Sequence, residues 1–230
     1  MMPAVKTTFQ LLTILAEPPG GAGPAGDEAS KHDDFVAPFR PDDDGNFAIE
    51  TILARLAQAS KTCPGGHVLK RASTVRGIAK AAKAATIAPR RFETLQIVGH
   101  GMPGQVSLGF YWNGVYFDGR NFYALDSNPH AYGVLRSLVE LTGVTQVRLI
   151  GCKVGSSESS GLATNGPTLL FSLGQLWKDC PTPVTVLASD DLVSADNFDE
   201  MTGNFTGRLV GLGDVGKSAG GLVAAGRRAR

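Results

Sequence analysis

Apolar residues recur along the middle and end of the chain in short runs separated by longer stretches with helical spacing. The runs at 144–150 and 184–189, and the mostly apolar LQIV run at 95–98, have the length of β-strands. The intervening stretches 130–141 and 166–179 repeat apolar residues with the period of an α-helix. Nearly continuous apolar strands of this kind are typical of a parallel sheet that is covered on both faces.

The first part of the chain continues the same alternation. The segment 5–18 predicts a first strand, and residues 67–73 predict a short second strand. Helices are predicted at 49–61, after acidic residues suited to its first turn, and at 74–87. Strands that alternate with helices predict an α/β fold with a mostly parallel central sheet.

An aromatic stretch at 106–125 interrupts this alternation. It contains the dipeptides Asn-Gly and Asp-Gly, which are strong signals for tight hairpin turns. We therefore expect a β-hairpin that packs at the edge of the sheet.

These elements divide the chain into one folded domain with appendages. We assign residues 1–17 to the first strand region, 18–45 to a flexible connection rich in Pro and Gly, and 46–210 to the α/β domain, which includes the first strand. Residues 211–230 are a Gly-rich basic tail. Within it, GLGDVGKS (211–218) matches a phosphate-binding loop, but too little chain follows for the helix and acidic residue that such a site needs, so we do not expect nucleotide binding.

Composition limits the classes of function. At 230 residues the chain can bury a substantial core, and 43% hydrophobic residues with a formal net charge of +1 are typical of a globular protein. This charge gives no reason to expect a nucleic-acid partner. No apolar run approaches the roughly 20 residues of a membrane-spanning helix. The segment 5–18 leaves export through a signal peptide as an alternative to a cytoplasmic location.

The cysteines point to a reducing compartment. The chain has three of them, Cys63, Cys152 and Cys180, widely spaced and without a CxxC pair. This pattern argues against a disulfide framework and against a zinc site. We expect a cytoplasmic protein with no metal and no cofactor.

Two predicted strands end in residues that carry chemistry. The run at 95–98 leads into a Gly-His-Gly turn with His100 and Gly101, and the run at 144–150 leads into Gly-Cys with Cys152. If the two strands are neighbours, about 4.8 Å apart, both side chains face one crevice at the carboxyl end of the sheet. The histidine can then activate the thiol, and the N–H groups of Gly101 and Cys152 can form an oxyanion hole.

This pair of strand-end motifs resembles the caspase-like cysteine peptidases, which include caspases, metacaspases and the CHAT-domain proteases. The resemblance covers about residues 90–200 and implies a caspase–hemoglobinase fold, a three-layer sandwich with a mostly parallel central sheet. It implies His100 as the general acid and base and Cys152 as the nucleophile. The segment ASDDLVSADNF (188–198) is similar to a metacaspase segment, which implies that Asp190 or Asp191 binds a basic P1 side chain.

The expected activity is that of a cysteine endopeptidase acting on protein or peptide substrates, with a regulatory protein partner as a further candidate. The polar loop at 155–166 is a candidate for substrate gating or self-cleavage. The alternative function is a catalytically inactive caspase-like domain that serves as a protein-binding or scaffolding module.

Overall fold

The computed structural model describes most of the α/β domain. The described residues are 7–16, 49–63, 66–72, 75–86, 90–107, 116–118, 129–158 and 165–212. The predicted connection at 18–45 lies outside them, as do residues 213–230 and the centre of the loop at 155–166. None of the described helices combines the length and apolarity that crossing a bilayer requires.

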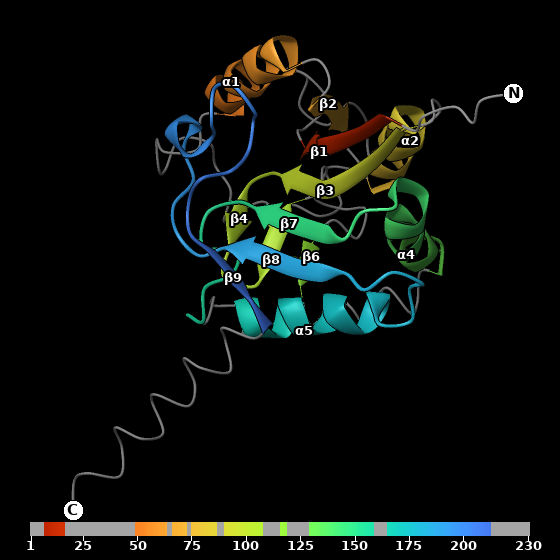
Figure 1. Cartoon of the computed structure of the whole chain (residues 1–230). Coiled ribbons are helices and arrows are strands. Elements are labelled where there is room, and N and C mark those ends of the chain that lie inside the picture. Colours follow the sequence, from red (N-terminus) through yellow and green to blue (C-terminus); the bar gives the residue numbers. More distant parts are fainter. Residues whose placement is uncertain are drawn as a thin grey trace, which may run out of the picture.

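The centre of the molecule is a six-stranded sheet with the order β2-β1-β3-β7-β8-β9. Its first five strands in this order are parallel, and β9 pairs with β8 in the antiparallel direction (Figure 1). The strands are β1 (Thr7–Ala16), β2 (His67–Ala72), β3 (Arg90–Val98), β7 (Gln146–Ile150), β8 (Thr185–Ser189) and β9 (Leu209–Gly211). The prediction of a mostly parallel sheet is confirmed.

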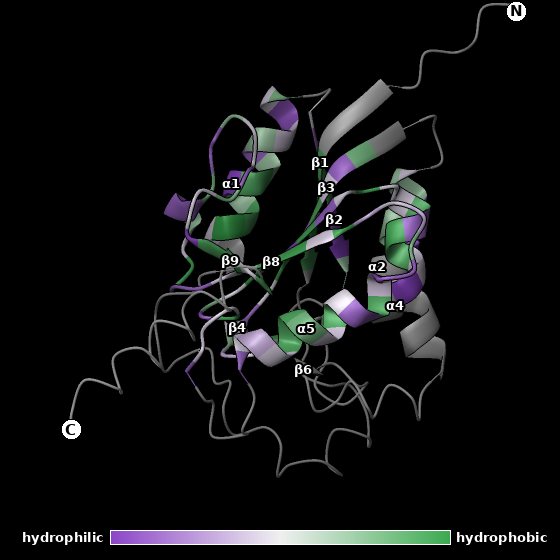
Figure 2. Ribbon diagram, turned by 60° about the horizontal axis from the view of Figure 1, so that its bottom comes forward, coloured by the Kyte–Doolittle hydropathy of each residue, from purple (hydrophilic) through white to green (hydrophobic). Residues whose placement is uncertain are grey.

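Helices cover both faces of this sheet. They are α1 (Ile49–Thr62), α2 (Val75–Ala85), α4 (Pro129–Thr142) and α5 (Gly166–Trp177). Helix α1 packs on one face with Leu15, Val98 and Ile150, whereas α2, α4 and α5 pack on the other face in a larger apolar cluster. Figure 2 shows α1 on one side of the strands and the other three helices on the opposite side. The domain is therefore an α/β fold compatible with a three-layer sandwich.

Strands β1 and β3 are buried because both of their faces are covered. Residues 11–15 of β1 are at most 1% exposed. Strand β3 begins at Arg90, five residues before the apolar run that predicted it, because its first residues pair with the first residues of β1. This pairing extends the sheet beyond the locally apolar segment.

The predicted hairpin forms, but in a separate sheet. Strand β4 (Gly101–Met102) pairs with β5 (Gln105–Ser107), which pairs with β6 (Tyr116–Asp118), all antiparallel. The hairpin is therefore not hydrogen-bonded to an edge strand of the main sheet. The chain turns back at Gly104, which has a φ of +74°, so the hairpin pairs with β4 rather than with an edge strand. The residues that connect β5 with β6 lie outside the described part of the chain.

A row of buried polar side chains crosses the face of the sheet that α1 covers. Thr13 and Gln96 are fully buried register partners on β1 and β3. The Nε2 atom of Gln96 donates to Oγ1 of Thr13 (3.3 Å) and to the carbonyl of Gly203 (3.1 Å), and its Oε1 accepts from the N–H of Phe205 (3.2 Å). Buried amide groups need hydrogen-bond partners. The bonds from Gln96 to Gly203 and Phe205 therefore attach the chain between β8 and β9 to the sheet.

His67 belongs to the same polar cluster and is 2% exposed. Its Nε2 atom lies 2.9 Å from Oγ1 of Thr13, and its Nδ1 atom has no hydrogen-bond partner among the described residues. Burial lowers the pKa of His67 from 6.5 to about 4 because the imidazolium would lose its hydration. The neutral ring is therefore the form that the fold accommodates.

The first prediction concerns acid stability. The unfolded chain binds a proton at His67 near the ordinary pKa, so stability is full above pH 6.5 and falls as the pH decreases toward the folded-state pKa of about 4. Between about pH 7.5 and about pH 4.5 the expected loss is on the order of 2–3 kcal/mol. Urea unfolding of wild type and His67→Gln at both pH values checks this, because the variant lacks this part of the loss. Equal losses in the two proteins would contradict the assignment.

The second prediction compares two glycines with similar backbone conformations. Gly203 and Gly143 have φ angles of +71° and +68°. A Cβ atom on Gly203 would lie 2.5 Å from Cε1 of His67, whereas a Cβ atom on Gly143 would meet nothing within 4 Å. Gly143→Ala should therefore cost about 1 kcal/mol of backbone strain, and Gly203→Ala should cost about 1–3 kcal/mol more from overpacking. Thermal or urea unfolding measures both, and equal costs would argue against the contact with His67.

Candidate active site

The parallel pairing of β3 with β7 brings His100 and Cys152 to equivalent positions. Val98 is the register partner of Ile150, and the N–H of Gly99 donates to the carbonyl of Ile150 (2.9 Å). His100 and Cys152 each follow these paired residues by two positions, and both are half-buried. The prediction that the two strands are neighbours is confirmed, and both residues lie at the carboxyl end of the sheet.

The glycines beside the two residues allow their backbones to pack directly against each other. A Cβ atom on Gly101 would lie 2.8 Å from the carbonyl carbon of Gly151 and 2.9 Å from the nitrogen of Cys152. A Cβ atom on Gly151 would lie 2.6 Å from the carbonyl oxygen of Gly99. Real Cβ atoms do not tolerate such contacts with backbone, so only glycine fits at these positions without displacement.

The turn after Cys152 is tightly hydrogen-bonded. Lys153 adopts a left-handed conformation with a φ of 55°, which is uncommon for a residue with a side chain. Its N–H donates to the carbonyl of Asp191 (2.9 Å), and the N–H of Val154 donates to the carbonyl of Gly151 (3.5 Å). These two amides are therefore engaged within the protein.

A serine that the sequence analysis did not single out braces this turn. Ser189, the last residue of β8, is fully buried. Its Oγ atom accepts a hydrogen bond from the N–H of Gly151 (3.0 Å) and donates to the carbonyl of the same residue. The sequence does carry a signal for this residue. Ser189 is the polar last residue of the mostly apolar run 184–189, which forms the strand beside the one that leads to Cys152.

The segment that connects β8 with β9, residues 190–208, covers the thiol from the side of α1. The Sγ atom of Cys152 lies 4.0 Å from the carbonyl oxygen of Val193, and Cys152 packs against the apolar cluster that contains Val193, Phe198 and Phe205. The rings of Phe198 and Phe205 meet edge to face, with their centroids 5.5 Å apart. We refer to residues 190–208 as the β8–β9 segment.

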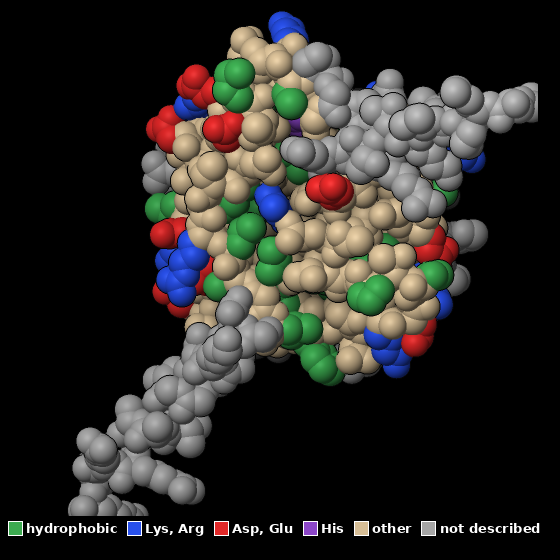
Figure 3. Space-filling model, viewed as in Figure 1, with side chains coloured by type: hydrophobic (Ala, Val, Ile, Leu, Met, Phe, Trp, Pro, Cys, Tyr) green, Lys and Arg blue, Asp and Glu red, His purple; other side chains and the backbone are tan. Residues whose placement is uncertain are grey.

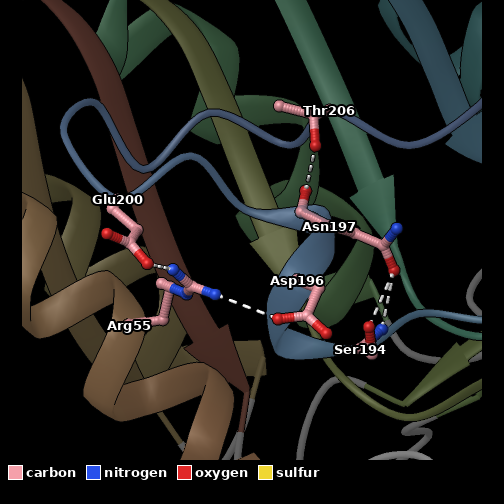
Figure 4. A network of polar contacts seen from close by, with 6 residues as sticks. All are labelled: Arg55, Ser194, Asp196, Asn197, Glu200 and Thr206. Carbon is pink, nitrogen blue, oxygen red and sulfur yellow. Dashed lines mark hydrogen bonds and ion pairs between the residues drawn. The ribbon is translucent and has the colours of Figure 1, made fainter.

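Helix α1 holds the β8–β9 segment through Arg55. The guanidinium forms an ion pair with Asp196 (3.0 Å) and another with Glu200 (Figure 4). Within the segment, Asn197 accepts hydrogen bonds from Ser194 through its side chain and from Thr206 through its carbonyl. The segment is thus a folded unit attached to both α1 and the polar row of the sheet.

The two acidic residues predicted to bind substrate follow β8 at the same edge of the sheet. Asp190 is 18% exposed and forms a salt bridge with Arg208 (3.3 Å). Asp191 is exposed, and its carboxylate accepts the N–H of Leu192 (2.8 Å). The arrows of the parallel strands point to the left in Figure 1. Figure 3, in the same view, shows acidic and basic side chains intermixed along that edge. The charge of Asp190 is therefore partly balanced, whereas Asp191 has no ion-pair partner among the described residues.

No protein-family model matches this chain, and no curated protein matches it significantly. Among the described residues, no group of three or more His, Cys, Asp or Glu side chains is arranged to hold a metal ion.

The third prediction tests the close packing of the two turns. Gly101→Ala places a methyl group against the Gly151–Cys152 backbone, so the two turns must separate. The expected cost is about 1–3 kcal/mol in the free energy of unfolding. The rate at which iodoacetamide alkylates Cys152 should also change, because His100 and the thiol move apart.

Gly143→Ala is the matched control, since a Cβ atom there meets nothing within 4 Å. It should leave the alkylation rate unchanged. If Gly101→Ala also leaves both the stability and the rate unchanged, the close packing is not as described.

Proposed function

We propose that the chain is a caspase-like cysteine endopeptidase in which His100 and Cys152 form the catalytic dyad. The observation that carries the proposal is the register of β3 and β7, which gives the two residues equivalent positions on neighbouring parallel strands. The layered α/β architecture agrees with the fold that the resemblance implies. The carboxyl end of a parallel sheet is also where side chains and unpaired backbone groups of α/β enzymes meet their substrates.

The proposed reaction proceeds in two stages. His100 takes the proton of the Cys152 thiol, and the sulfur attacks the carbonyl carbon of the scissile peptide bond. The N–H groups of Gly101 and Cys152 stabilise the oxyanion, and the imidazolium of His100 protonates the leaving amine as the C–N bond breaks. Water, deprotonated by His100, then attacks the thioester, so that a carboxylic acid leaves and the thiol regains its proton.

A basic P1 side chain is the preferred substrate feature under this proposal. Both Asp190 and Asp191 are candidates for binding it, but Arg208 already balances the charge of Asp190. The exposed carboxylate of Asp191 is two residues past the end of β8, as Cys152 is two residues past the end of β7. The N–H of Lys153 donates to the carbonyl of Asp191, which fixes this residue beside the nucleophile turn. We therefore assign the basic preference to Asp191 first.

The fourth prediction tests the dyad directly. Purified wild type should hydrolyse fluorogenic peptides with Arg or Lys at P1, and Cys152→Ala should lose this activity. His100→Ala should lower kcat by at least about 100-fold, because the proposal assigns both proton transfers to its imidazole. The control is Cys180→Ala, which removes a thiol elsewhere in the domain and should retain activity.

Two outcomes would contradict the proposal. Equal hydrolysis by wild type and Cys152→Ala would exclude the thiol as the nucleophile. Absence of hydrolysis across peptides with Arg, Lys and Asp at P1, together with slow alkylation of Cys152 at about pH 6, would favour an inactive binding module instead.

A further inference from the structure

The buried hydroxyl of Ser189 contacts both polar groups of Gly151. It accepts the N–H of Gly151 (3.0 Å) and donates to the carbonyl of Gly151, with the carbonyl of Leu149 at 3.4 Å as a more distant acceptor. Ser189 is fully buried, so water does not compete for these bonds. Together with a longer hydrogen bond from the N–H of Val154 to the same carbonyl (3.5 Å), this side chain fixes the conformation of the residue immediately before the thiol.

The carbonyl of Gly151 and the N–H of Cys152 belong to the same peptide group. None of the described peptide bonds is cis, and a trans peptide group directs its C=O and N–H in opposite directions. Because Ser189 holds the C=O toward β8, the N–H of Cys152 points away from β8, to the side where β3 lies. In agreement, the nitrogen of Cys152 would be 2.9 Å from a Cβ atom on Gly101.

We propose that Ser189 is a positioning residue that prevents the Gly151–Cys152 peptide group from flipping and so keeps the Cys152 N–H aimed as an oxyanion-hole donor. This inference rests on the proposed peptidase function, and it adds a residue that contacts neither the substrate nor the thiol. Without the hydroxyl, the Gly151 carbonyl keeps the longer hydrogen bond from the N–H of Val154 (3.5 Å), and glycine at 151 offers little steric resistance to a flip because it has no Cβ. The flipped group would present its carbonyl oxygen to the substrate oxyanion, which is repulsive.

The kinetic test separates oxyanion stabilisation from thiol activation. Peptide hydrolysis develops an oxyanion, whereas alkylation by iodoacetamide is a displacement at a CH₂ carbon and does not use that donor. Ser189→Ala should lower kcat by about 10- to 1,000-fold while KM stays within about twofold. The alkylation rate of Cys152 and its pH profile should stay close to those of wild type.

Thr142→Val is the matched control. It removes another buried hydroxyl, which donates to the carbonyl of Leu138 at the end of α4. It should lower stability without changing kcat. A fall in both kcat and alkylation rate in Ser189→Ala would mean that the site is generally disordered, and unchanged kcat would mean that Ser189 has no positioning role. Either result overturns the inference.

A spectroscopic test does not depend on activity. Gly151–Cys152 is the only Gly-Cys dipeptide in the chain, so ¹³C-carbonyl glycine combined with ¹⁵N-cysteine gives one correlated NMR signal for this peptide group. The Gly151 carbonyl resonance should move in Ser189→Ala, because the carbonyl loses the hydrogen bond from Ser189 and keeps the longer one from the N–H of Val154. It should stay in place in Thr142→Val. An unmoved signal in Ser189→Ala overturns the inference.

The two tests also distinguish the two proposals. If wild type hydrolyses peptides but Ser189→Ala is equally active with an unmoved signal, the peptidase stands and the role of Ser189 falls. If wild type hydrolyses no peptide but the signal moves, Ser189 does orient the peptide group and the peptidase proposal falls.

Discussion

The parallel pairing of β3 with β7 is the constraint on which the candidate site depends. The register of two paired strands fixes the relative positions of the residues that follow them. Here the residues that follow are His100, after β3, and Cys152, after β7. Hydrogen bonding continues one residue past β3, from the N–H of Gly99 to the carbonyl of Ile150. The adjoining glycines then permit backbone contact between the two turns, so the site is built by the sheet and not by the surrounding loops.

Strand β8 and the β8–β9 segment add a second layer of support. Ser189 ends β8 and holds the peptide group before Cys152, while Val193 lies beside the thiol. The segment itself is attached through polar contacts, from Gln96 to its backbone and from Arg55 to its acidic residues. Because the Gln96 contacts are buried and the ion pairs are exposed, the former contribute more to its attachment. The environment of the thiol thus depends on residues of β3, β8, the β8–β9 segment and helix α1.

The helices and strands were largely predictable, because each carries a local apolar period. Strand β8 and helix α5 lie within one or two residues of their predicted bounds. The start of β3 was not predictable in this way, since its first residues depend on pairing with β1. The hairpin forms a separate sheet because the chain turns back at Gly104, which lets β5 pair with β4.

The candidate site was predictable only in part, for a related reason. His100 and Cys152 stand out because each follows an apolar run and a glycine. Gln96 interrupts such a run, but its partners Gly203 and Phe205 are more than 100 residues away, and no local pattern identifies them. The same holds for Asp190, whose salt bridge to Arg208 forms only when β9 pairs with β8.

Disulfide trapping tests the central juxtaposition most directly. Neighbouring strands lie about 4.8 Å apart, within the range of Cα separations that a disulfide accepts, about 4.4–6.8 Å. In a chain with Cys63 and Cys180 replaced by serine, H100C should therefore form a cross-link to Cys152 under mild oxidation, identified by peptide mapping of the folded protein. Two thiols that stay reduced in the folded protein, while free cysteine in the same solution oxidises, would contradict the shared site on which the account rests.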